Sequence, residues 1–211
     1  MKHLIIIGVG GFAREVYWHA QDSLGYGTEW DLKGFLDGDV KLSADEYEKL
    51  SLSVLGDIDN YDIQDDDVFI CAVGEPVIKE KLVKRMLERG AKFLNLIHRT
   101  ALICETSQMG VGNILSPYTC LSDHVVIGNY VTINASSGMG HDSKLGDFST
   151  LSSGVDIMGN AHIGRLVFFS GGAKALPHSN VEDDVYVGVG SVVFKRIKKG
   201  RRVFGNPAMP I

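Results

Sequence analysis

The stretch ICETSQMGVGNILSPYTCLSDHVVIGNYVTINASSGMGHDSKLGDFSTLSSGVDIMGNAHIGRLVFFSGGAKALPHSNVEDDVYVGVGSVV, residues 103–193, carries an apolar residue at every sixth position. The residues in this phase are Ile103, Met109, Leu115, Leu121, Ile127, Ile133, Met139, Leu145, Leu151, Ile157, Ile163, Phe169, Ala175, Val181, Val187 and Val193. A helix repeats every 3.6 residues and a strand every two, so neither element alone produces a period of six. Short strands joined by corners do, because each side of such a coil directs one bulky side chain inward. Stacked coils share one apolar column, so the stretch predicts a parallel β-helix.

Small residues occupy a second position of the same repeat, four residues after most of the apolar ones, as at Ser137, Ser149 and Ala161. Glycine often follows the apolar residue directly, as at Gly128 and Gly146. We expect the small side chains to fit the corners and the glycines to relieve the turns. The phase never slips, so no loop is expected to leave the coils.

The first part of the chain alternates strand and helix patterns instead. Strands are expected at residues 3–8, 32–36, 68–73 and 91–97. Helices are expected between residues 8 and 25 and over 76–88, with loop and a short helix in 43–61. Pro76 at a helix start and Gly90 just past its end are typical of helix boundaries. The pattern predicts a small Rossmann-like parallel α/β domain over 1–97, followed over 98–211 by the β-helix and a C-terminal tail.

Composition narrows the classes of function. The net charge of −5 gives no case for nucleic-acid binding. Three scattered cysteines, Cys71, Cys104 and Cys120, argue against a disulfide framework or a thiolate zinc site and suit a reducing compartment. The apolar run at residues 4–7 is too short for a membrane span or a signal segment. We therefore expect a cytoplasmic protein without a membrane span.

A glycine-rich turn follows the first expected strand. Gly8, Gly10 and Ala13 fit the pattern G-x-G-x-x-G/A, in which glycines let phosphate oxygens approach backbone N–H groups at a helix start. Asp37, at the end of the second strand, is placed to accept a hydrogen bond from a ribose or a base. The domain is about half the size that a dinucleotide fold needs, which favours a mononucleotide diphosphate over NAD. The alternative is a tight turn without a ligand.

One histidine of the repeat stands out. His141 comes two residues after the inward-facing Met139, so its side chain is expected to point outward, and Asp142 follows it. An imidazole is largely neutral near pH 7 and can accept a proton, while a carboxylate can fix its tautomer. Asn134 could add a hydrogen bond. A solvated surface histidine is the alternative, and a histidine metal site between subunits is disfavoured because His124 and His162 occupy other positions of the repeat.

Six segments together resemble the sialic-acid O-acetyltransferase NeuD family, which includes bacterial UDP-amino-sugar N-acetyltransferases. They are IIIGVGGFAREV (5–16), FLD (35–37), VGE (73–75), LIHRTALI (96–103), SSGMGHDSKLGD (136–147) and GNPA (205–208). The resemblance covers essentially the whole chain. It implies a left-handed β-helix, a homotrimer with active sites between subunits, and acetyl transfer from acetyl-CoA to a sugar.

The resemblance also implies roles for individual residues. His141 would be the general base, assisted by Asp142 and Asn134. The nucleotide sugar would meet Gly8, Gly10, Gly11, Asp37, Gly74 and Glu75. Acetyl-CoA would meet Thr150, Gly159, Gly171, Gly188, Val189, Asn206 and Pro207. No metal is implied.

The expected reaction is therefore N-acetylation of a UDP-4-amino-sugar type of substrate for glycan synthesis. O-acetylation of a sialic acid or another sugar hydroxyl is one alternative, and a non-catalytic trimeric partner of a sugar synthase is another. A dehydrogenase is the least favoured. The basic run at residues 195–202 either meets the 3′-phosphate of CoA or is a solvated tail.

Overall fold

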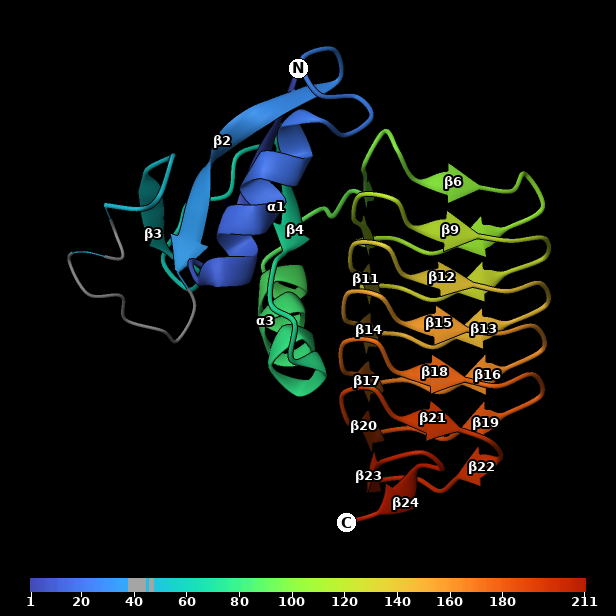
Figure 1. Ribbon diagram of the computed structural model, residues 1–211. Coiled ribbons are helices and arrows are strands. Elements are labelled where there is room, and N and C mark those ends of the chain that lie inside the picture. Colours follow the sequence, from blue (N-terminus) through green and yellow to red (C-terminus); the bar gives the residue numbers. More distant parts are fainter. Residues whose placement is uncertain (38–44, 46–47) are drawn as a thin grey trace. The chain divides into compact units, whose positions relative to one another are not determined.

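The computed structural model describes residues 1–37, 45 and 48–211. The chain divides into two compact units, Met1–Arg99 and Thr100–Ile211. The first is a parallel α/β unit and the second is a solenoid of short parallel strands (Figure 1). This confirms the fold class expected from the sequence. No helix within the described part of the chain is long and apolar enough to cross a membrane.

The sheet of the first unit is parallel throughout and has the order β3-β2-β1-β4. Its strands are β1 (Lys2–Ile7), β2 (Trp30–Asp37), β3 (Val54–Asp57) and β4 (Asp67–Cys71). Leu4, Ile5, Ile6 and Ile7 are fully buried in the central strand. A short strand covered on both faces needs such a continuous apolar run.

Two helices accompany this sheet, α1 (Gly11–Gln21) and α3 (Pro76–Glu88). In α1 the buried residues Ala13, Val16 and Ala20 recur at spacings of three and four, as one face of a helix requires. In α3 the Glu75 carboxylate caps the start by accepting a hydrogen bond from the Ile78 N–H at 2.7 Å. Both boundary predictions for α3 are confirmed, because Pro76 opens the helix and Gly90 follows its end with a positive φ of 84°.

The prediction of the fourth sheet strand was wrong. The structure has β3 at Val54–Asp57, within the region expected to hold loop and a short helix; most of residues 43–47 lie outside the described part of the chain. Residues 91–97, the expected strand, make one bridge from Phe93 to Phe69 and contain only the two-residue strand β5 (Leu96–Ile97). Glycine at position 56, with φ of 146°, hides the strand pattern of β3, which is a short edge strand.

The second unit is built from two-residue strands, each pairing with the strand 18 residues along the chain. They are β6 (Leu102–Ile103), β7 (Gln108–Met109), β8 (Ile114–Leu115), β9 (Cys120–Leu121), β10 (Val126–Ile127), β11 (Thr132–Ile133), β12 (Gly138–Met139), β13 (Lys144–Leu145), β14 (Thr150–Leu151), β15 (Asp156–Ile157), β16 (His162–Ile163), β17 (Phe168–Phe169), β18 (Lys174–Ala175), β19 (Asn180–Val181), β20 (Tyr186–Val187), β21 (Val192–Val193) and β22 (Arg196–Ile197). The tail adds β23 (Arg202–Phe204) and the antiparallel β24 (Met209–Pro210). Three residues of strand and corner per side, twice over, give the period of six.

The apolar column is confirmed. Its residues from Leu115 to Val193 are buried, whereas Ile103 and Met109 in the first coil are half-buried. Small residues at the corners add internal hydrogen bonds between coils. Ser137 Oγ accepts from the Val155 N–H at 3.1 Å and Ser149 Oγ from the Val167 N–H at 3.0 Å. These bonds satisfy buried backbone donors where the strands end.

The expected role of the corner glycines was wrong in part. Gly146 and its equivalents do not have positive φ; a Cβ on Gly146 would lie 2.6 Å from the Arg165 nitrogen of the next coil. Close approach of the neighbouring coil, rather than a turn, therefore requires glycine there. The left-handed residue comes two positions later and is mostly not glycine, as at Phe148 (φ 60°) and Leu166 (φ 56°). The repeated corner imposes this conformation despite its cost for L-residues.

Acid is expected to destabilise the first unit through His19 and His98, whose rings meet edge-on with centroids 6.1 Å apart. Burial lowers the pKa of both, and His98 lowers the pKa of His19 further. The unfolded chain therefore binds these protons more readily, so stability is lost as the pH falls from about 6.5 towards the lowered pKa values. The melting temperature measured between pH 7.5 and pH 5 checks this.

The double variant His19→Gln/His98→Gln is expected to lose part of that pH dependence. The exposed His178→Gln variant serves as the control and is expected to keep it. Parallel pH profiles for the wild type and the double variant would contradict the assignment.

Candidate active site

The carboxyl ends of β1, β2 and β4 form the first candidate site, within the first unit. The Gly8 N–H donates to the Leu36 carbonyl at 2.9 Å, and a Cβ on Gly8 would lie 3.2 Å from the Ala72 carbonyl oxygen. Gly8 also has φ of 110°, so only glycine fits without strain. This point lies between β1 and β4, where the strand order reverses and parallel α/β sheets bind ligands.

The other predicted residues of this site lie at the same sheet edge. Gly10 is the N-cap of α1 and offers no side-chain cap, and Gly11 begins the helix, so the first N–H groups of α1 are available to an anion. Asp37 ends β2 and is half-buried. Gly74 lies between β4 and α3. Glu75 uses its carboxylate to cap α3, which is a structural role that the sequence did not indicate.

The second candidate site is a corner of the solenoid. We call it the histidine corner: residues 123–124, 141–142, 159–160 and 177–178, stacked at intervals of one coil and following β9, β12, β15 and β18. His141 lies there with its side chain 64% exposed. Its Nδ1 is 2.9 Å from Asp142 Oδ2. An Nδ1–H that donates to this carboxylate leaves Nε2 unprotonated and able to accept a proton.

The ring of His141 lies over Gly159 of the next coil. A Cβ at position 159 would come within 2.6 Å of His141 Nε2 and 2.8 Å of Cε1. The missing side chain therefore makes room for the ring and keeps the proton-accepting nitrogen over a bare stretch of backbone.

Gly159→Ala is accordingly expected to displace the imidazole and to impair any reaction that depends on it. We expect kcat to fall about tenfold or more, because small misplacements of a catalytic group have large effects on rate. Gly172→Ala has no atom within 4 Å of its new Cβ but carries the strain of φ 68°, so it controls for stability. Unchanged kcat in a folded Gly159→Ala protein would contradict the role of this contact.

A second histidine–aspartate pair lies one coil before His141 and was missed. His124 Nδ1 is 2.9 Å from Asp123 Oδ2, and Thr106 Oγ1 donates to Asp123 Oδ1 at 2.5 Å. The hydrogen bond with Asp123 raises the pKa of His124, while the bonds from Thr106 and His124 lower the pKa of Asp123. The spacing of 18 residues between Asp123 and His141 could have revealed that these pairs share a corner.

The remaining predicted residues lie elsewhere on the solenoid. Asn134, Gly171 and Val189 follow β11, β17 and β20, and so occupy the preceding corner, which we call the asparagine corner (residues 134–137, 170–173 and 188–191). Thr150 is buried in β14. A Cβ on Gly188 would overlap the ring of Phe204. Asn206 and Pro207 are exposed in the tail. The structure thus brings His141, Asp142 and Gly159 together, and it places the others one side of the coil away or further.

Metal chemistry finds no obvious place here. Among the described residues, no group of three or more His, Cys, Asp or Glu side chains is arranged to hold an ion. His141 and His124 each pair with one carboxylate instead.

A parallel α/β unit followed by a β-helix with this period is the architecture of hexapeptide-repeat acetyltransferases. Residues 3–86 match the family model described as the PglD N-terminal domain. The chain is 27% identical to a GDP-perosamine N-acetyltransferase of Escherichia coli O157:H7 over 137 residues, which cover 65% of this chain and 54% of the relative. The chain thus spans about half the length of that relative.

Two solved structures match over the full chain. The acetyltransferase domain of PglB from Neisseria gonorrhoeae FA1090 is 27% identical, with a TM-score of 0.88 and complete coverage of both chains; another structure of that domain holds acetyl coenzyme A. PerB from Caulobacter crescentus, in complex with CoA and GDP-perosamine, is 24% identical, covers 100% of this chain and 98% of its own, and has a TM-score of 0.88, a likeness of fold. The chain is a relative of the bacterial sugar N-acetyltransferases, which confirms the resemblance.

Proposed function

We propose that the protein transfers the acetyl group of acetyl-CoA to the amino group of a nucleotide-linked amino sugar. The observation that carries the proposal is the His141–Asp142 pair, with Nδ1 held at 2.9 Å from the carboxylate and the ring over the bare backbone of Gly159. The names of the relatives supply the class of substrate and the acetyl donor.

In the proposed mechanism the sugar nitrogen attacks the thioester carbonyl carbon while His141 Nε2 takes the proton from that nitrogen. The C–S bond then breaks, and the proton on His141 passes to the departing CoA sulfur, so base and acid roles alternate on one ring. Asp142 fixes the tautomer and stabilises the imidazolium. Orientation of the two substrates contributes the rest of the rate enhancement.

The placement of the predicted CoA residues supports an oligomer. Gly159 lies on the histidine corner, whereas Gly171 and Val189 stack one coil apart, about 4.8 Å, on the asparagine corner. An extended pantetheine arm that met both sets within a single chain would have to cross a whole side of the coil. We propose a homotrimer in which the histidine corner of one subunit faces the asparagine corner, and with it Asn134, of the next.

The first unit is proposed to hold the nucleotide diphosphate. Gly8, the uncapped start of α1 and Asp37 lie at the sheet edge where such a ligand binds. The nucleotide base is proposed to be uracil or guanine, the latter by similarity to the GDP-perosamine enzymes. The free thiols of Cys71, Cys104 and Cys120 suit a reducing compartment, so we place the protein in the cytoplasm.

The role of the first unit is tested with Asp37→Ala. Loss of one hydrogen bond to a carboxylate is expected to raise KM for the nucleotide sugar about tenfold or more and to leave KM for acetyl-CoA alone. UDP- and GDP-linked amino sugars and the free amino sugars form the substrate panel, with steady-state kinetics as the measurement. Equal kcat/KM for free and nucleotide-linked sugars would remove the nucleotide from the proposal.

A further inference from the structure

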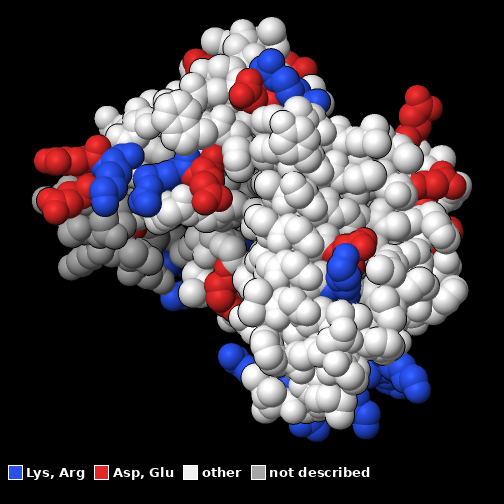
Figure 2. Space-filling view, viewed as in Figure 1, with Lys and Arg blue, Asp and Glu red and all other residues white. Residues whose placement is uncertain are grey.

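The charge of the chain is divided very unequally. Residues 195–211 contain six Lys and Arg and no Asp or Glu, a formal charge of +6, so the net charge of −5 leaves −11 for residues 1–194. The six cations are Lys195, Arg196, Lys198, Lys199, Arg201 and Arg202. Figure 2 shows blue side chains gathered at the end of the solenoid where Figure 1 draws β22–β24. This end therefore attracts an anionic partner.

A cavity of about 670 Å³ opens among these cations, within the size range of ligand pockets. It is lined by Phe194, Lys195, Arg196, Ile197, Lys198, Arg201, Pro207, Ala208, Met209 and Pro210. We call it the C-terminal cavity. Its lining comes from the last coil strand β22, the connection to β23, and the tail strand β24. The sequence gave no sign of it, because the tail returns antiparallel to β23 and leaves the period of six.

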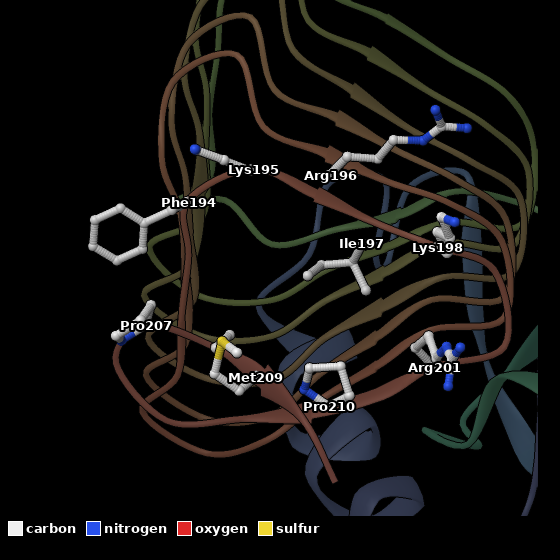
Figure 3. A pocket seen from close by; sticks show the side chains of 10 residues that line it. Phe194, Lys195, Arg196, Ile197, Lys198, Arg201, Pro207, Met209 and Pro210 are labelled. Carbon is white, nitrogen blue, oxygen red and sulfur yellow. The ribbon is translucent and has the colours of Figure 1, made fainter.

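The C-terminal cavity has two chemically different ends. In Figure 3 the apolar side chains of Ile197, Met209 and Pro210 lie between Phe194 and Pro207 on one side and Lys198 and Arg201 on the other. Phe194 is 49% and Met209 60% exposed, which is unusual for large apolar side chains that have no partner. The lining thus suits a molecule with an apolar part and an anionic part.

Most of the cations at this cavity are not neutralised within the chain. Arg196 pairs with Glu182 at 2.5 Å, and this is the only ion pair that the described residues form with Lys195, Arg196, Lys198 or Arg201. The Glu182 carboxylate also accepts from the Lys199 N–H at 3.0 Å. Three cations around one apolar cavity exceed what a single monoanionic group requires.

We propose that the C-terminal cavity and its basic rim dock on an anionic membrane surface, with a phospholipid headgroup at Lys198 and Arg201 and apolar contact at Phe194 and Met209. Clusters of Lys and Arg near a membrane are attracted by anionic lipids, and neighbouring apolar side chains add burial to that attraction. This goes beyond acetyl transfer, because it assigns a place of action to the protein and does not involve His141.

The test is co-sedimentation of the full-length protein with vesicles of phosphatidylcholine alone or mixed equally with phosphatidylglycerol. We expect binding at least about tenfold tighter to the mixed vesicles, weakening as salt is added. Lys195→Gln/Lys198→Gln/Arg201→Gln is expected to lose that preference, and Met209→Glu to weaken binding at fixed salt. Lys2→Gln/Lys92→Gln/Lys144→Gln removes the same charge from exposed lysines elsewhere and is expected to bind as the wild type does.

Several outcomes would overturn the proposal. Equal binding of the wild type to both vesicle types would do so, as would equal losses in the two triple variants. Displacement from the vesicles by millimolar CoA, together with a tenfold rise in KM for acetyl-CoA in the first triple variant, would assign the cavity to the CoA phosphates instead. Inorganic phosphate at the same concentration controls for simple charge screening. The acetyl-transfer assay is separate, so its failure is distinguishable from failure of docking.

Discussion

His141→Ala is expected to lower kcat/KM for acetyl transfer by about 10²–10⁴-fold, the range that positioned general bases contribute. The side chain is 64% exposed and makes its hydrogen bond only with its neighbour Asp142, so its removal leaves the coil intact. The loss should therefore appear in kcat, with an unchanged melting temperature. Steady-state kinetics and a thermal scan on the same preparation measure both.

The matched control for this prediction is His162→Ala. His162 is an exposed histidine of β16 in the same solenoid, one residue before the column residue Ile163 and away from the histidine corner. It is expected to retain wild-type turnover. If both variants turned over within about threefold of the wild type, the base would not be His141.

Phe169→Ala is expected to destabilise the solenoid by about 3–5 kcal/mol, the cost of truncating a fully buried Phe. Phe169 is completely buried in the column, and its strand β17 pairs with β14 and β20, so the cavity would open between three coils. Rigid corners on both sides limit any collapse into that space. Chemical denaturation monitored by circular dichroism, with the slope checked for an added intermediate, gives the value.

Phe168→Ala, the same change one residue earlier, is the control. Phe168 points outward, where it stacks on Tyr186 with ring centroids 5.3 Å apart, and is only half-buried. Its loss is expected to cost less than half as much. Equal costs at the two positions would mean that the inward column does not hold the coils together.

The column could be predicted because its cause is local and repeated. Each inward position, such as Phe169 or Leu151, faces the same geometry one coil apart, so the requirement for an apolar residue returns every six residues. Strand β3 could not be predicted in this way. It is four residues long, carries Gly56, and is defined by its pairing with β2 rather than by its own sequence.

The candidate site was predictable only to the same extent. His141 and Asp142 are neighbours in sequence, so their pairing followed from the pattern. The position of Gly159 under the imidazole, and of Asp123 and His124 one coil before it, depends on how coils stack at intervals of 18 residues. The C-terminal cavity depends on where the tail folds back, which no periodicity encodes.

The most direct test of the account is product analysis of the wild-type protein incubated with acetyl-CoA and a GDP- or UDP-linked amino sugar. The account predicts one acetyl group on the sugar nitrogen, identified by mass and NMR, and one CoA thiol released for each product molecule. Acetylation of a hydroxyl would contradict the proposed acceptor. Absence of product from every nucleotide-linked amino sugar, with folded protein and intact acetyl-CoA, would contradict the proposed enzyme itself.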